Sequence, residues 1–210
     1  MKKGFTYFEL LIVLSLILII GSIIIGVLRV PEYFKRARDL QRLNDLQVLA
    51  SLIQNYINST STPDLDGPYL DFRGIDEVWP TIFISVPLED PNISTTTFIC
   101  NNQVFAIYRS NKNNFRKLDG TGWLPINFVG SLTALPISSL PVDPINVYTN
   151  STSTSFYYAY AFRRKPAQFE LSAYFESKDF QYGGKNDKVS TDNGSDPYRY
   201  EIGTNLNILP

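Results

Sequence analysis

Few residues in this sequence could do chemistry, and their types exclude the commonest active sites. The chain of 210 residues contains no histidine and a single cysteine, Cys100. Catalysis by Ser-His-Asp or Cys-His groups and zinc sites built from cysteine and histidine are therefore excluded. The sequence also lacks a phosphate-binding loop and a dinucleotide fingerprint. We therefore expect no catalytic residues and a protein that is not an enzyme.

One loop has the oxygen-rich composition that Ca²⁺ prefers. Asp187, Asp192, Asn193 and Asp196 lie within ten residues of a Gly- and Ser-rich stretch, and calcium is bound by carboxylate and carbonyl oxygens. A solvated surface loop explains the same composition, and we favour that interpretation. Asp187, Asp192 and Asp196 are thus the candidate calcium ligands, and no other metal or cofactor is expected.

A lone acid, Glu9, stands at the start of the most apolar segment of the chain. From Leu10 to Leu28 there are 19 residues without a charge. A helix of that length, at about 1.5 Å per residue, roughly matches the hydrocarbon thickness of a bilayer. A carboxylate at the edge of such a segment is unfavourable unless it is paired. Glu9 therefore needs a partner, and the segment offers no cation close by.

Two simpler interpretations of this segment remain open. A secretory signal peptide would have residues 1–3 as its basic region, but the apolar run is long and no Ala-x-Ala-like site follows it. A plain membrane anchor would leave Glu9 without a role. The side of a membrane span with more basic residues usually lies in the cytoplasm. Two basic residues precede the segment and five follow it, so the count favours a cytoplasmic C-terminal part. They are Lys2 and Lys3, then Arg29, Lys35, Arg36, Arg38 and Arg42.

The pattern KGFTYFELLIVL closely resembles the N-terminus of type IV prepilins and type II secretion pseudopilins. The resemblance covers Lys2 to about Leu28. It implies that prepilin peptidase cuts between Gly4 and Phe5 and that Phe5 is then N-methylated. It also supplies a partner for Glu9, because in that family the acid pairs with the methylated α-amine of a neighbouring subunit during assembly.

The resemblance implies a structural subunit of a type IV pilus or a type II secretion-like pseudopilus, polymerised through its N-terminal helix. The implied partners are prepilin peptidase, other pilin or pseudopilin subunits, an assembly platform in the membrane, and membrane lipid. The implied location is a single pass through the cytoplasmic membrane with the head outside, and an extracytoplasmic filament at the cell surface after assembly. That orientation is opposite to the one given by the basic residues. A membrane-anchored minor pilin or adhesin-type binding module is the alternative function.

The element that follows the span is predicted to be an amphipathic helix. Apolar residues recur at three- and four-residue steps from Val30 to Ile57, and turn residues follow at 58–63. If the helix is continuous from Phe5 to Ile57, it extends on the order of 80 Å. The charged residues of this stretch are expected on a solvated face and not at a nucleic-acid site: Lys35, Arg36, Arg38, Asp39, Arg42 and Asp45.

The remaining residues, 58–210, are predicted to form one β-rich head. Six segments have the composition of strands, at 81–86, 97–100, 104–109, 156–162, 169–175 and 198–202. The head carries 12 basic and 16 acidic residues, a net charge of −4 that gives no reason to expect nucleic acid.

The family resemblance implies an α+β, pilin-like fold in which the C-terminal half of the long N-terminal helix packs on an antiparallel sheet. The expected organisation is a leader at 1–4, a transmembrane and assembly helix at 5–30, an amphipathic helix at 31–57 and the head at 58–210.

Overall fold

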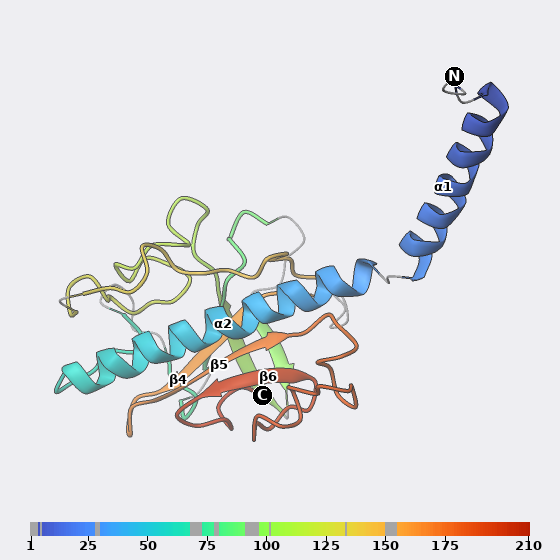
Figure 1. Ribbon diagram of the computed structural model, residues 1–210. Coiled ribbons are helices and arrows are strands. Elements are labelled where there is room, and N and C mark those ends of the chain that lie inside the picture. The colour runs from blue at the N-terminus through green and yellow to red at the C-terminus, as the bar shows by residue number, and fades with distance from the viewer. Residues whose placement is uncertain are drawn as a thin grey trace.

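A computed structural model describes the chain apart from residues 1–3, 5, 28–29, 68–72, 78–79, 91–96, 101, 133 and 150–154. Its first element is the apolar helix α1 (Tyr7–Val27), which projects away from the rest of the molecule (Figure 1). Tyr7–Ile24 is long and apolar enough to cross a membrane, and none of this stretch is buried within the chain. The prediction of an apolar helix at this position is confirmed.

The second helix, α2 (Val30–Ser59), confirms the predicted amphipathic helix and runs slightly past its predicted end. It begins with Pro31 in its first turn, where a missing backbone amide donor leaves no hydrogen bond unmade. Its second half buries a stripe at alternating steps of three and four residues: Leu46, Leu49, Ile53 and Tyr56. The joint between the two helices, and with it the prediction of one continuous rod, lies at residues 28–29, outside the described residues.

Six strands form one sheet in the order β2-β3-β1-β4-β5-β6. They are β1 (Thr81–Ile84), β2 (Thr97–Cys100), β3 (Gln103–Tyr108), β4 (Tyr158–Arg163), β5 (Gln168–Tyr174) and β6 (Arg199–Gly203). All six predicted strands are confirmed, each within two residues at either end. The alternation of aromatic and small residues in the β4–β5 hairpin fits a sheet whose two faces are both covered.

The sheet is mixed, so the prediction of an antiparallel sheet is wrong for one pair of strands. β1 runs parallel to β3, with Thr81 opposite Ala106 and Phe83 opposite Tyr108. A parallel pair needs a crossover connection, and here the connection contains β2, which pairs antiparallel with β3 as a hairpin. That hairpin returns the chain beside β1 in the direction of β1.

The two faces of the sheet are covered by different parts of the chain. α2 lies across one face and contacts β5 and β6 (Figure 1). The apolar core between α2 and this face also includes side chains from a long excursion of the chain between β3 and β4. These are Trp123, Ile126 and Phe128, all fully buried. The other face is covered by the C-terminal residues Ile208 and Leu209, which belong to the second apolar cluster.

Candidate functional site

The N-terminal segment contains a local partner for Glu9. The Oε2 atom of Glu9 accepts hydrogen bonds from the backbone N–H and the hydroxyl of Thr6, both at 2.9 Å, and the hydroxyl of Thr6 accepts one from the backbone N–H of Glu9 at 3.3 Å. This reciprocal arrangement is a capping box at the start of α1, and Thr-x-x-Glu is its sequence signature. The local partner of Glu9 is thus a pair of neutral donors and not the cation that was expected.

The capping box leaves part of Glu9 available. Its other carboxylate oxygen, Oε1, makes no hydrogen bond within the part of the chain that the structure describes, and the side chain is exposed. Gly4 is also exposed, with no atom within 4 Å of the position a Cβ would take. Phe5, the predicted methylation site, lies outside the described residues. The segment is thus accessible at Gly4 and Glu9.

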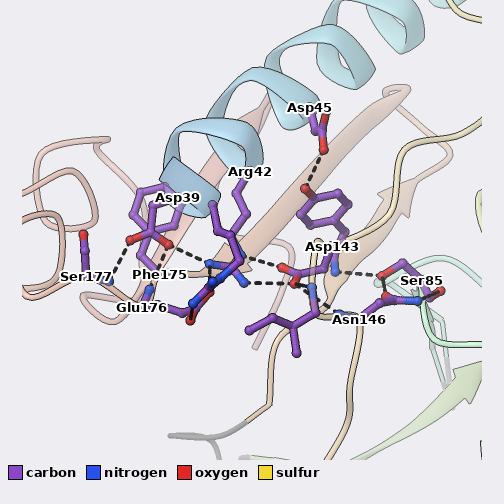
Figure 2. A network of polar contacts seen from close by, with 12 residues as sticks. Asp39, Arg42, Asp45, Ser85, Asp143, Asn146, Phe175, Glu176 and Ser177 are labelled. Atoms are coloured by element: carbon purple, nitrogen blue, oxygen red, sulfur yellow. Dashed lines mark hydrogen bonds and ion pairs between the residues drawn. The ribbon is translucent and has the colours of Figure 1, made fainter. Parts of the chain in front are cut away.

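A second polar centre, which the sequence analysis did not predict, lies under α2 and is built around Arg42 (Figure 2). The guanidinium of Arg42 is fully buried and donates two hydrogen bonds to Asp143, from Nε to Oδ2 at 2.6 Å and from Nη2 to Oδ1 at 2.9 Å. Its Nη1 donates to Asp39 at 2.7 Å and lies 2.6 Å from Oε1 of Glu176. The guanidinium also stacks over the ring of Phe156, at 4.9 Å from its centroid.

The carboxylates of this centre are bound from several directions. Asp39 accepts backbone N–H groups of Glu176 at 2.8 Å and Ser177 at 2.7 Å. Glu176 in turn accepts two hydrogen bonds from Arg38, at 2.8 and 2.6 Å. We call Arg38, Asp39, Arg42, Asp143 and Glu176 the charge cluster. It joins the first half of α2 to the end of β5 and to the long excursion.

The charge cluster continues into the sheet through neutral side chains. Asp143 accepts the backbone N–H of Asn146, and the Asn146 side chain exchanges two hydrogen bonds with Ser85, which follows β1. The Ser85 hydroxyl accepts the backbone N–H of Tyr158, and the Tyr158 hydroxyl donates to Asp45 at 2.8 Å (Figure 2). The network therefore returns to α2 one turn further along the helix.

Electrostatics favour the charged forms of Glu176 and Arg42, whereas burial acts against the charge of Asp39. Burial is the largest influence on Glu176 and would raise its pKa, but the hydrogen bonds and charges of Arg38 and Arg42 outweigh it and lower that pKa. Burial raises the pKa of Asp39, against the backbone N–H groups that it accepts. For Arg42, burial favours the neutral form, yet Asp143 and Glu176 raise its pKa. Two arginines thus face three carboxyl groups in an environment with little water.

The expectation that Asp39 and Arg42 lie on a solvated helix face is wrong, because both are 0% exposed. A signal for this was present in the sequence. Positions 39, 42, 46, 49, 53 and 56 advance by three and four residues, so Asp39 and Arg42 continue the buried stripe of α2. Conversely, Tyr33, Phe34 and Leu40 belong to the apolar pattern between Val30 and Ile57, but they are 63%, 61% and 51% exposed.

A further buried carboxyl, that of Glu170 on β5, holds the C-terminal residues. Its Oε2 accepts the backbone N–H groups of Ile208 at 2.7 Å and Leu209 at 2.9 Å. Burial, and then the neighbouring carboxyl of Glu201, raise the pKa of Glu170 to about 8. A paired carboxyl with a raised pKa is also the pattern of an acid catalyst. Here the side chain is fully buried beneath the C-terminal residues, where no substrate could reach it.

The three candidate calcium ligands use their carboxylates to organise their own loops. Asp187 accepts N–H groups of Gly183, Val189 and Ser190. Asp192 accepts those of Gly194 and Glu201, and Asp196 accepts that of Tyr198. Among the described residues, no three His, Cys, Asp or Glu side chains are placed to hold a metal ion together.

The geometry therefore offers two candidate features: an accessible, capped acid at the start of an exposed apolar helix, and a buried charge cluster that fastens the following helix to the head. Comparisons of the chain with protein-family models, with curated proteins and with solved structures found no match.

Proposed function

We propose that this protein is the structural subunit of a filament of the type IV pilus or type II secretion pseudopilus kind, anchored in the membrane by α1 before assembly and polymerised through it. The proposal is supported mainly by the combination of the first nine residues with the exposed apolar helix α1 that follows them. Gly4 is followed by Phe5, Glu9 has one oxygen in the cap and one free, and the apolar helix behind them is uncovered.

An uncovered helix of this kind requires a second apolar body. The described side chains of α1 are exposed on all sides of the helix, among them Leu14, Ile17 and Leu18 at 50%, 60% and 71%. Removing each such side chain from water is favourable by about 1.5–3 kcal/mol when it is fully buried. Lipid covers such a helix before assembly, and the helices of other subunits cover it in a filament.

The charge cluster supports the same proposal. It fastens α2 to the head about two to three and a half helical turns after Val30, where α2 begins, because Arg38 and Arg42 are directional two-point donors to Glu176 and Asp143. In a filament, force on the helical core reaches the heads through α2. A helix held by buried ion pairs resists sliding, since any shift leaves charges without partners.

The decisive experiment is the intact mass of the protein extracted from membranes of the cell that makes it. Processing at the predicted site removes Met1 to Gly4 and adds one methyl group to Phe5. An unprocessed chain, or one cut after the apolar segment, would refute the proposal. A topology reporter fused after Pro210 tests the accompanying orientation and should be active outside the cytoplasm.

Glu9 is tested with two variants that separate its two roles. Glu9→Ala removes both the cap and the free oxygen, and we expect it to be inserted and processed but to assemble poorly. Thr6→Val removes the hydroxyl from the capping box, at about 1 kcal/mol of helix stability, and leaves the carboxylate in place. We expect Thr6→Val to form filaments. If both variants lose filaments equally, Glu9 acts only as a helix cap.

The second candidate function is a membrane-anchored minor pilin or adhesin-type binding module. It is favoured by a groove of about 570 Å³ on the head, whose walls are the segments 112–119 and 135–139. Antibody against the head distinguishes the two functions, because a main subunit is labelled along the whole filament and a binding module is labelled at its tip.

A further inference from the structure

We infer that this groove is a docking site for an extended, acidic and apolar peptide segment of a partner protein. The inference does not depend on filament assembly, since every residue used below belongs to the head of a single chain. Three properties of the groove carry it: an excess of positive charge, an apolar lining, and a wall with free backbone groups.

The charge of the groove is positive although the head is not. Lys112, Arg116 and Lys117 line it within six residues of sequence, and none of them forms an ion pair within the described part of the chain. The lining contains one acid, Asp119, whose carboxylate already accepts the backbone N–H of Thr121 at 3.0 Å and its hydroxyl at 2.6 Å. Three cations against one acid give the groove an excess of positive charge on a head of net charge −4, and this excess provides electrostatic complementarity to an anion.

The apolar lining of the groove indicates which kind of anion it binds. Between the cations lie Phe115, Leu118, Val129, Leu135 and Ile137, and Val129 is 59% exposed. A phosphate ion or a nucleic-acid backbone gains nothing from these side chains. A peptide that alternates acidic and apolar residues satisfies both the cations and the apolar wall, because successive side chains of an extended chain point to opposite sides.

One wall of the groove offers main-chain groups to a ligand. The segment 135–139 forms no helix or strand, and its backbone N–H groups donate no hydrogen bond to any described residue. Pro136 has no N–H, so this wall cannot be a regular central strand. Backbone groups of an irregular edge are available to an extended peptide, which pairs by main-chain hydrogen bonds as in strand addition.

The groove is held open by its own structure. Arg116 donates from Nε to the carbonyl of Leu140 at 3.0 Å, and the backbone N–H of Leu140 donates to the carbonyl of Arg116 at 2.8 Å. These reciprocal bonds tie the two walls together at one end. Gly122 packs against the same junction, where a Cβ would overlap the carbonyl oxygen of Lys117. A preformed site loses little ordering entropy when it binds.

The test uses the full chain in neutral detergent micelles and a fluorescein-labelled decapeptide of alternating leucine and aspartate. Fluorescence anisotropy should report saturable binding that weakens as sodium chloride is raised. A decapeptide of alternating leucine and lysine is the charge control and should not bind. Lys112→Glu/Lys117→Glu should weaken binding by about tenfold or more, as expected for reversing two charges at the rim of a site, and Val129→Asp should weaken it similarly.

The matched control is Lys185→Glu/Lys188→Glu, which makes the same charge change at two exposed lysines outside the groove. It should bind the acidic peptide within about twofold of the original protein, since it changes only the long-range field. Circular dichroism and melting curves exclude unfolded variants. Arg116 is left intact because it ties the walls together.

Several outcomes would overturn the inference. Equal loss of binding in the two double variants would show that only net charge matters, and equal binding of the lysine peptide would remove the charge argument. Full displacement of the peptide by inorganic phosphate would assign the groove to a simple anion. Self-association that disappears in Lys112→Glu/Lys117→Glu would assign it to a second copy of this chain. Each result is independent of N-terminal processing and therefore of the proposed filament function.

Discussion

Replacing Arg42 with methionine should destabilise the head strongly, because three buried carboxylates share this one guanidinium. Asp39, Asp143 and Glu176 all lie within 2.9 Å of its nitrogens. Methionine fills much of the same volume, so the loss of charge dominates over the loss of packing. Breaking a buried ion pair by removing one partner costs about 3–5 kcal/mol. For a chain of this size that corresponds to a melting temperature lower by about 6–20 °C.

The assay is urea and thermal unfolding of the full chain in micelles, followed by tryptophan fluorescence. Trp123 is fully buried and lies 6.4 Å from the ring of Tyr158, so its emission reports on the core beside the charge cluster. The matched control is Arg36→Met on the same helix. Arg36 is about half exposed and pairs with Asp179 at 3.3 Å, and such surface pairs contribute about 1 kcal/mol or less.

Arg42→Lys adds a graded test of the same reasoning. Lysine keeps the positive charge but cannot make the two-point contact with Asp143, so its stability should fall between those of Arg42→Met and the original protein. If Arg42→Met costs no more than Arg36→Met, the charge cluster does not fasten α2 to the head. The support that it gives to the proposed function would then be lost.

Two further predictions concern the buried carboxyl and the candidate calcium loop. Burial raises the pKa of Glu170 from 4.5 to about 8, so the folded state holds a proton that the unfolded state releases. Stability from this group is complete below pH 4.5 and is lost as the pH rises through 8, by at most about 5 kcal/mol. Glu170→Gln should flatten the melting temperature between pH 5 and pH 9, and an unchanged pH profile would contradict the shift. Adding calcium or a chelator should move the melting temperature by about 1 °C or less, because the carboxylates of Asp187, Asp192 and Asp196 already accept hydrogen bonds from loop amides. A melting temperature that rises with calcium concentration would show that calcium binds the folded state and would contradict this prediction.

The sequence predicted the strands well because their pattern is local. β4 and β5 consist mainly of aromatic and small residues and are bounded by turns, and they pair in register from Tyr158 opposite Ala173 to Arg163 opposite Gln168. The parallel pairing of β1 with β3 depends on where the β2–β3 hairpin docks. No residue inside those strands specifies that docking, so the direction of the pair could not be read from them.

The charge cluster could be predicted only in part. The periodicity of α2 already places Asp39 and Arg42 on its buried stripe. Their partners could not be found in this way, because Asp143 and Glu176 lie 101 and 134 residues beyond Arg42 in the sequence. Asp143 stands between Pro141 and Pro144, a setting typical of an ordinary turn. Only the packing of the long excursion against α2 shows that the carboxylate of Asp143 in this turn is buried beside Arg42.

The partners of the arginines also bear on the orientation of the chain in the membrane. Five basic residues follow the apolar segment, and by number they argue for a cytoplasmic head. Three of them have a structural role, since Arg36, Arg38 and Arg42 pair with Asp179, Glu176 and Asp143. These ion pairs give the three arginines a structural role whatever the topology. Without them, Arg29 and Lys35 balance Lys2 and Lys3. The count of basic residues then favours neither orientation, and the proposed outward-facing head no longer conflicts with it.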